Sequence, residues 1–251
     1  MKRIAVAICL LAALAALADA EDKKPEPPKI VAVAPLRLVI GETQKVQLRG
    51  LKLKDVTEVR CTPPMVLSVK EKKDAAPPNG LSANDVGDQE LVVEVTVPAD
   101  CTARTISLEV VTPDGTTIPR EFAIVAKDAE AREKEPNNGF REAQPWDTGK
   151  PMTGRIDADK DVDVFRADGH AGKTFAMTAV AAAAGALALD PILSVFDADG
   201  RLLSSADDSA GIGNDAHISI VPKRDGPLFI VVSDANDRSG EWHEYRLKAQ
   251  P

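Results

Sequence analysis

The stretch Leu91-Val-Val-Glu-Val-Thr-Val97, closed at once by Pro98, is the best guide to the fold. Its β-branched residues favour extended backbone, and its polar residues Glu94 and Thr96 stand two apart, as on a strand with one solvated face. Pro98 carries no amide hydrogen for a sheet, so the strand is expected to end there. The segment therefore predicts a β-strand that lies in a half-buried sheet.

Runs of this kind recur along the whole chain, separated by Gly, Pro, Asp and Asn. Thr112-Pro-Asp-Gly115 and Asp197-Ala-Asp-Gly200 have the residues of tight hairpin turns. The predicted strands are 30–34, 36–40, 45–49, 56–61, 66–70, 90–97, 105–111, 117–125, 151–156, 162–167, 173–180, 191–197, 201–204, 216–221, 228–233 and 244–248. So many short strands in a chain of this length predict an all-β protein of two β-sandwich domains.

Residues 1–20 have the features of a signal peptide. Lys2 and Arg3 precede a continuous apolar run from Ile4 to Leu17, and Ala18-Asp-Ala20 fits a small-residue cleavage site. The run is short for a bilayer span of about 20 residues, and no later segment is apolar enough for one. We therefore expect export, with a secreted, periplasmic or cell-surface location and no membrane span.

The negative charge is concentrated in the second half. The chain has a formal charge of -8, whereas residues 21–127 carry 15 basic and 16 acidic side chains and residues 128–251 carry 14 and 22. A nucleic-acid binder is expected to show a basic face, so neither half favours that class of partner. An acidic half can hold cations, or it can simply keep an exported domain soluble.

Cys61 and Cys101 are the only cysteines beyond the predicted signal peptide. An even pair in an exported protein predicts one disulfide, and the alternative is two buried free thiols.

The segment Lys127–Lys134 is charged and lacks large apolar residues, which favours a linker. Two other stretches interrupt the strand pattern. Residues 71–88 read as a long polar loop, and 176–189 as a strand to about Val180 followed by a loop of small residues.

Two segments after the linker are rich in oxygen donors. Six carboxylates and two carboxamides occur in Glu133-Lys-Glu-Pro-Asn-Asn138 and in Asp157-Ala-Asp-Lys-Asp-Val-Asp163. Ca²⁺ takes six to eight oxygen ligands, several of them charged, so the two segments predict a Ca²⁺-binding β-module. The alternative is a solvated acidic linker followed by a polar turn. An EF-hand is excluded, because Val162 stands where that loop needs glycine.

The first half resembles an immunoglobulin-like domain of the IPT/TIG type. The resemblance covers 28–126 and is carried by Pro28-Lys-Ile-Val-Ala-Val-Ala-Pro35, Gly41, Gly50, Thr112-Pro-Asp-Gly-Thr116 and Phe122-Ala-Ile-Val125. It implies a β-sandwich that serves as a spacer or a binding platform, and it implies no chemistry.

The second half, residues 133–251, resembles the bacterial pre-peptidase C-terminal domain over 133–249, with 127–132 as the linker before it. The resemblance is carried by an ordered series: Glu133-x-Glu-Pro-Asn-Asn138, Gly154-x-Ile156, Asp161-x-Asp163-x-Phe165, Gly172, Leu189-Asp-Pro-Ile-Leu193, Phe196-Asp-x-Asp-Gly200, Asp207-Asp208, Gly226 and Tyr245-x-Leu247. It implies a jelly-roll-like β-sandwich. In collagenase members of that family the domain binds Ca²⁺ through its acidic segment and binds collagen on one face.

Carried over by position, the resemblance implies a calcium site at Glu133, Glu135, Asn137, Asn138, Asp161 and Asp163. Asp157 and Asp159 are weaker candidates, because aspartates are also common in plain turns. Collagen binding in that family relies on exposed tyrosines. This chain has only Tyr245, which we expect to pack inside, as we expect of Trp146 and Trp242.

The sequence lacks the motifs of common hydrolases. His243-Glu-Tyr-Arg-Leu247 begins like a zinc-protease helix but ends in leucine where the second histidine must stand, and no nucleophile elbow is present. We therefore expect an exported, non-catalytic binding or scaffolding protein whose partner is an extracellular polysaccharide or protein matrix. The alternatives are an accessory or regulatory partner of a secreted peptidase, or a hydrolase with an unrecognised site.

Overall fold

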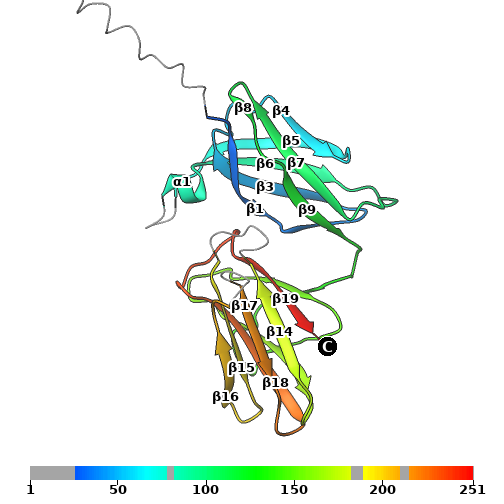
Figure 1. Ribbon diagram of the computed structural model, residues 1–251, viewed down its shortest axis with the longest axis vertical. Helices are drawn as coiled ribbons and strands as arrows, with labels where there is room; N and C mark the ends of the chain where they lie inside the picture. The colour runs from blue at the N-terminus through cyan, green and yellow to red at the C-terminus, as the bar shows by residue number, and fades with distance from the viewer. Residues whose placement is uncertain (1–25, 78–81, 182–188, 210–214, 251) are drawn as a thin grey trace, which may run out of the picture.

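The computed structural model describes residues 26–77, 82–181, 189–209 and 215–250. Within these ranges the chain is almost entirely β-structure, arranged as two sandwiches that follow one another along the long axis of the molecule (Figure 1). The predicted signal peptide lies outside the described residues, and so does most of the alanine-rich stretch 181–184.

The N-terminal sandwich consists of two sheets whose strands are mostly antiparallel. Sheet A has the order β1-β3-β6-β5 and sheet B the order β2-β9-β7-β4, with β8 paired to β7. The strands of sheet A are β1 (Lys29–Ala34), β3 (Thr43–Leu51), β6 (Gln89–Thr96) and β5 (Val66–Asp74). Those of sheet B are β2 (Arg37–Val39), β9 (Arg120–Val125), β7 (Thr105–Thr112), β4 (Glu58–Thr62) and β8 (Gly115–Thr116).

The core of the N-terminal sandwich comes from alternate residues of both sheets. Leu91, Val93 and Val95 of β6 are fully buried and meet Leu108 and Phe122 of sheet B in one apolar cluster. The strand that the sequence identified first thus lies at the centre of the domain, with its apolar side chains against sheet B.

The C-terminal sandwich is built in the same way from two five-stranded sheets. Sheet C has the order β10-β12-β19-β14-β17 and sheet D the order β11-β13-β18-β15-β16. The strands of sheet C are β10 (Ala131–Arg132), β12 (Met152–Arg155), β19 (Glu244–Gln250), β14 (Phe175–Val180) and β17 (Ala216–Ile220). Those of sheet D are β11 (Gln144–Pro145), β13 (Asp163–Gly169), β18 (Gly226–Asp234), β15 (Pro191–Phe196) and β16 (Leu202–Ala206).

Aromatic side chains fill the centre of this second core. Phe165 lies between Trp146 and Tyr245, with edge-on ring contacts at a centroid distance of 6.5 Å on each side. Tyr245 and Phe165 have no exposed surface, and Trp146 is 5% exposed. The predictions that Tyr245 and Trp146 pack in the core are therefore confirmed. The prediction for Trp242 is wrong: it is only half-buried and belongs to neither core cluster, because it precedes β19 in a surface turn.

All sixteen predicted strands are present, with ends shifted by a few residues. The prediction missed β8, β10 and β11, which have two residues each and carry no periodic pattern. The prediction also treated 71–88 as one loop. In the structure β5 continues to Asp74, and the short helix α1 (Ala83–Val86) lies near the end of this range.

A buried arginine holds this loop in place. Arg49 is 7% exposed, and its guanidinium donates to the backbone oxygens of Val86 at 2.9 Å, Ala75 at 3.1 Å and Ala76 at 2.7 Å. A guanidinium offers five donors in a fixed fork, so one side chain can satisfy several carbonyl groups at once. Arg49 therefore ties both ends of the loop to β3.

The predicted disulfide is not formed in the structure. Cys61 on β4 and Cys101 after β6 are free thiols, and both are partly buried against the N-terminal core. Burial raises the pKa of Cys61 to about 11, which keeps the unreactive thiol form. Both cysteines thus pack as small apolar side chains, the alternative considered for them.

The two sandwiches share no sheet, but polar contacts join them. In the described chain no strand of sheets A and B pairs with a strand of sheets C and D. Leu36 N donates to Glu244 Oε2 at 3.1 Å, and Glu130 forms ion pairs with Arg37 at 3.3 Å and with Arg246 at 2.8 Å. The segment read as a linker therefore contributes β10 to sheet C and connects both domains through Glu130. Independent folding of the two halves stays a prediction.

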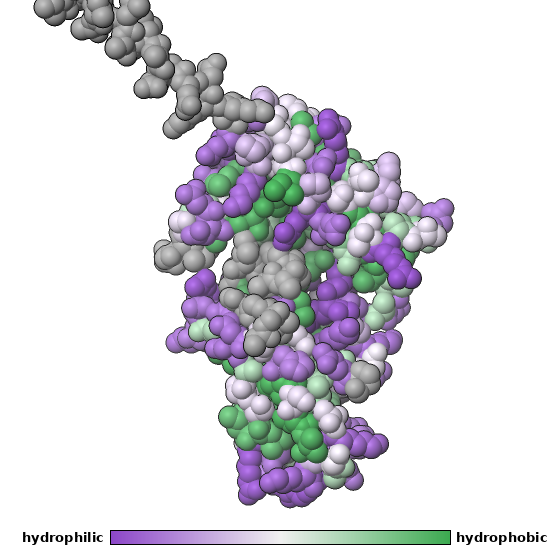
Figure 2. Space-filling model, viewed as in Figure 1, coloured by the Kyte–Doolittle hydropathy of each residue, from purple (hydrophilic) through white to green (hydrophobic). Residues whose placement is uncertain are grey.

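The sheet edges differ in their side chains. β5, which ends sheet A, carries Lys70, Lys72 and Lys73 and is offset by a bulge between Val69 and Glu71. β16, which ends sheet D, has the uncharged sequence Leu-Leu-Ser-Ser-Ala. Leu202 and Leu203 are 55% and 41% exposed, and Figure 2 shows hydrophobic surface in the region of β15 and β16.

Candidate metal centre

Three carboxylates from two separate segments meet where the chain enters the C-terminal sandwich. Glu133 and Glu135 follow β10, and Asp163 begins β13. One oxygen of each lies within 4.8 Å of the others. The Val164 amide donates to the Asn137 carbonyl oxygen at 2.9 Å, and this bond holds the acidic segment against β13.

Asp163 is the buried member of the cluster. It has no exposed surface; its Oδ2 accepts a hydrogen bond from the Tyr245 hydroxyl at 2.6 Å, and its Oδ1 is buried without a partner. Burial, together with the Glu133 carboxylate beside it, raises the pKa of Asp163 far above its usual range. The folded protein thus resists a charged Asp163 unless a positive charge lies next to it.

The two glutamates are held by hydrogen bonds that fix their direction. Glu133 Oε2 accepts from the Arg155 amide at 2.7 Å, and its Oε1 accepts from Asn137 Nδ2 at 2.8 Å. Glu135 Oε2 accepts from the Asn137 amide at 3.1 Å. Burial raises the pKa of Glu135, and the nearby Glu133 and Asp161 carboxylates add to that effect.

The asparagines complete a shell of oxygens. Asn137 is fully buried, and its Oδ1 has no hydrogen-bond partner. Asn138, with its amide nitrogen turned inward, donates to Asp161 Oδ1 and Glu135 Oε2 at 3.2 Å each. Turned the other way, the same amide presents its oxygen to those carboxylates, as a cation ligand would.

The remaining aspartates have other partners. Asp161 accepts from the amides of Asp157 and Val162 at 2.9 and 3.0 Å, so it shapes the turn before β13 and also faces Glu135. Asp157 is paired with Arg155, and Asp159 accepts from the Ser239 hydroxyl at 2.7 Å. The structure therefore brings Glu133, Glu135 and Asp163 together, with Asn137 and Asn138 bonded to these glutamates and Asp161 beside Asn138. Asp157 and Asp159 have other partners.

Tyr245 and Gly154 support the site, although the sequence analysis gave them no role there. A Cβ atom on Gly154 would lie 2.6 Å from Glu133 Oε2 and closer still to the Tyr245 hydroxyl. Only glycine lets β12 pass so near to both groups. Both residues belong to the ordered series that carries the family resemblance, and that series was the available signal.

The residues present fit a hard divalent cation. The donors are carboxylate and carboxamide oxygens from irregular backbone, without a histidine or cysteine among them. Two of the oxygens, Asp163 Oδ1 and Asn137 Oδ1, are buried and unpartnered, which costs free energy unless a ligand satisfies them. A bound Ca²⁺ would supply positive charge here and would join the acidic segment to β13.

We expect Asp163→Asn to stabilise the protein when metal is withheld. The amide keeps an acceptor for Tyr245 and gives Glu133 a donor without the cost of protonating a buried carboxylate, so the free energy of unfolding in EDTA should rise by about 1–2 kcal/mol at pH 8. Thermal melts of the full chain in EDTA test this. Asp168→Asn, the same change at an exposed position of β13, should leave the melt unchanged. A lower melting temperature for Asp163→Asn would contradict the expectation.

Comparison with known proteins gives structural likenesses and no family. No family model matches the chain, and no curated protein matches it. One similar solved structure is the pre-peptidase C-terminal domain of a Bacillus anthracis collagenase, at 12% identity and a TM-score of 0.36, covering 47% of this chain and all of that one.

Two further solved structures extend over both sandwiches. One is the protein SGBP-B of a Bacteroides ovatus mixed-linkage glucan utilization locus in complex with a heptasaccharide, at 12% identity and a TM-score of 0.29, covering 86% of this chain. The other is the secreted serine protease VesC of Vibrio cholerae, at 9% identity and a TM-score of 0.29, covering 85%. The chain spans 42% and 48% of these two proteins. The chain is similar to these three proteins, and at these TM-scores the similarity supports no conclusion about its role.

Proposed function

We propose that this is an exported, non-catalytic binding or scaffolding protein whose C-terminal sandwich is stabilised by Ca²⁺. The observation that carries the proposal is the cluster of Glu133, Glu135 and Asp163, with ligand atoms within 4.8 Å of one another. Such a set of charges close together is unfavourable without a cation, because like charges repel more strongly where solvent is excluded.

The role of the cation in this proposal is structural. The cluster contains acids and amides but no nucleophile–base pair, so it offers positions for an ion and no evident chemistry for bond cleavage. Asp163 is closed off from solvent by Tyr245 and the β13 backbone. A cation would link the entry of the domain to its first long strand and leave the outer sheet faces free for partners.

Export is the second part of the proposal. It rests on the signal-peptide features of residues 1–20. In the described part of the chain no helix is long and apolar enough to cross a membrane. Extracellular Ca²⁺ is abundant, so a weak site with dissociation constant in the range of about 10⁻⁴–10⁻³ M would be filled there.

Two measurements test the proposal. Isothermal titration of the full chain with Ca²⁺ should show one site, which Mg²⁺ fills poorly because its octahedral geometry and tightly held water do not suit this shell. An array of neutral glycans, acidic glycans and matrix proteins should then give at least one ligand. Absence of Ca²⁺ binding, or of any ligand on the array, would overturn it. Turnover of a peptide or glycan substrate would favour the hydrolase alternative, and specific binding of a secreted peptidase the accessory one.

A further inference from the structure

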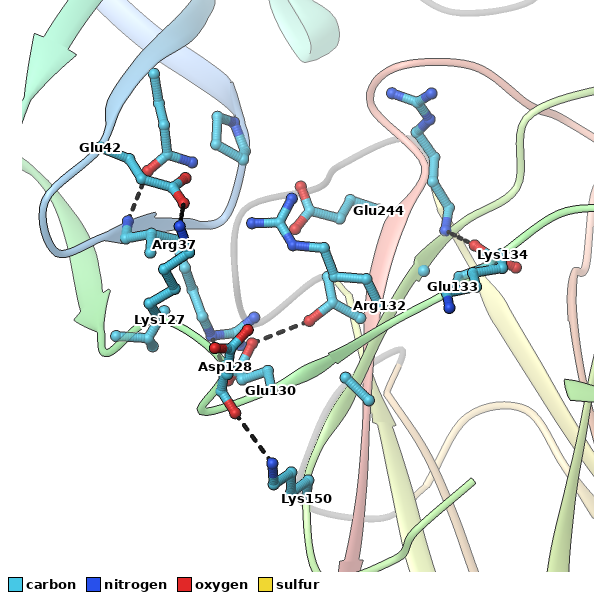
Figure 3. Close-up of a pocket in the computed structure, with 18 of the residues that line it drawn as sticks. Arg37, Glu42, Lys127, Asp128, Glu130, Arg132, Glu133, Lys134, Lys150 and Glu244 are labelled. Carbon is cyan, nitrogen blue, oxygen red and sulfur yellow. Dashed lines mark hydrogen bonds and ion pairs between the residues drawn. The ribbon is translucent and has the colours of Figure 1, made fainter. Parts of the chain in front are cut away.

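A cleft of about 1000 Å³ lies between the two sandwiches and is crossed by the chain segment that joins them (Figure 3). One wall is formed by β2 and the turn after it, with Arg37, Glu42 and Gln44. The other is formed by β10, β12 and the segment before them. None of the described residues that line it is aromatic, and few of them are apolar. Pockets for apolar ligands have the opposite lining, so the cleft favours a ligand recognised through charge.

Most carboxylates of the cleft already have partners. Glu130 is held by Arg37 and Arg246, and its other oxygen accepts from the Thr153 hydroxyl at 2.9 Å. Glu244 accepts from the Leu36 amide, and burial raises its pKa. Glu133 and Glu135 belong to the metal cluster, which a bound cation would neutralise.

Several cations of the cleft are, in contrast, not paired with carboxylates. Arg132 and Lys134 are exposed, and neither forms a salt bridge with any described residue. Among the described residues Lys150 donates only to the Asp128 backbone oxygen, at 3.3 Å, whereas Lys127 is paired with Glu42 at 3.8 Å. In Figure 3 these four side chains lie along the two sides of the joining segment. Arg132, Lys134 and Lys150 have no carboxylate partner among the described residues, and three such cations suit a ligand that carries several negative groups.

The free edge of β10 is closed to an added peptide strand. Gln144 accepts a hydrogen bond from the Lys134 amide at 2.7 Å and donates to the Arg132 carbonyl oxygen at 2.9 Å. These are the backbone groups that strand addition would use. A peptide would also find few apolar side chains to anchor it here. The side chains of Arg132 and Lys134 remain available, and they favour an acidic sugar chain over an acidic peptide.

We propose that this interdomain cleft binds an acidic polysaccharide, and that Arg132 and Lys134 contact its carboxylate or sulfate groups. The inference rests on the proposed function, because Glu133 and Glu135 also line the cleft and need a cation to offset their charge. It specifies the ligand class and the surface, which the proposed function leaves open.

The test is binding of the full chain, in the presence of Ca²⁺, to three short oligosaccharides: tetragalacturonate for carboxylates, a sulfated tetrasaccharide for sulfate esters and a dextran tetrasaccharide as the neutral probe. We expect at least one acidic probe to bind, dextran not to bind, and affinity to fall as salt rises. The double variant Arg132→Gln with Lys134→Gln should weaken binding about tenfold, since two cations at the ligand are lost.

The matched control is Lys173→Gln with Lys223→Gln. These lysines are exposed in the turns before β14 and β18, and neither lines the cleft. Their replacement removes the same charge. This variant should bind within about twofold of the unchanged protein. Both double variants should keep the Ca²⁺ response, which shows that they are folded and that the metal cluster is intact.

Each other outcome has a defined meaning. Equal binding of dextran, or unchanged binding in the Arg132 and Lys134 variant, overturns the inference. Tighter binding of an oligoglutamate peptide than of either acidic sugar replaces the polysaccharide by an acidic peptide and overturns it too. A neutral glycan or matrix protein that binds all variants equally leaves the proposed function standing without this cleft. If the unchanged protein shows no response to Ca²⁺, the proposed function is overturned, and this inference is overturned with it.

Discussion

Removal of Ca²⁺ is expected to lower the melting temperature of the C-terminal sandwich by about 10 °C. A ligand that binds only the folded form adds about 2.7 kcal/mol at a hundredfold excess over its dissociation constant, and 1 kcal/mol moves the midpoint of a domain of this size by about 4 °C. The cation would remove the repulsion around Asp163 and join the acidic segment to β13. The N-terminal sandwich contributes no residue to the cluster, so its transition should stay where it is.

The chain offers a clean probe for this measurement. Trp146, Trp242 and Tyr245 are its only tryptophans and tyrosine, and all lie in the second half. Intrinsic fluorescence of the full chain therefore follows the C-terminal sandwich alone, whereas calorimetry follows both domains. The shift should appear in the fluorescence melt and in one of the two calorimetric transitions.

The variant Glu135→Gln with Asp163→Asn should lose the Ca²⁺ response, because it removes two of the three converging charges. Its melts in Ca²⁺ and in EDTA should coincide, at a midpoint no lower than that of the unchanged protein in EDTA. Identical melts of the unchanged protein in Ca²⁺ and EDTA would reduce the cluster to an acidic surface without a bound ion.

Among glycine-to-alanine substitutions in the C-terminal sandwich, Gly154→Ala is expected to lower the stability most. The added Cβ would meet Glu133 Oε2 at 2.6 Å and would also overlap the buried Tyr245 hydroxyl. Neither group can yield easily, since Glu133 is bonded to the Arg155 amide and Tyr245 has no exposed surface. We expect a loss of about 2–3 kcal/mol in the free energy of unfolding, as for an overpacked core, and a weaker Ca²⁺ response.

Gly139→Ala is the matched control. It lies close by in sequence, has no atom within 4 Å of the position of a Cβ, and does not need a positive φ angle. It should leave both the fluorescence melt and the calcium titration unchanged. Equal effects of the two substitutions would mean that Gly154 is not required for the approach of Tyr245 and Glu133.

The strands could be predicted because their pattern is local. In β7 and in most of β18 every second side chain is buried, and this period is visible within six residues. The two-residue strands β8, β10 and β11 have no period to detect, and their pairing depends on neighbours far along the chain. The contacts of the segment read as a linker could not be predicted for the same reason: the partners of Glu130 are Arg37 and Arg246, which lie 93 and 116 residues away.

The site could be predicted in composition but not in geometry. The concentration of acids in 133–138 and 157–163 predicted a cluster of oxygen donors, and the structure brings Glu133, Glu135 and Asp163 together. The sequence ranked Asp157 below Asp163, but it could not show that Asp163 is buried beside Tyr245 while Asp157 stays exposed. The cysteine pair misled for a related reason: count and compartment favour a disulfide, while only packing decides whether two thiols meet.

The contrast between the two outer strands β5 and β16 bears on how copies of the protein behave at high concentration. An edge strand exposes unpaired backbone groups that can pair with another chain, and lysines and bulges oppose this. β5 has both defences. β16 has a bulge at Leu203 but no charged side chain, and it presents Leu202 and Leu203 to solvent. Self-association would therefore begin at sheet D, and Ser204→Lys in the middle of β16 is the change that would suppress it while leaving the metal cluster and the cleft untouched.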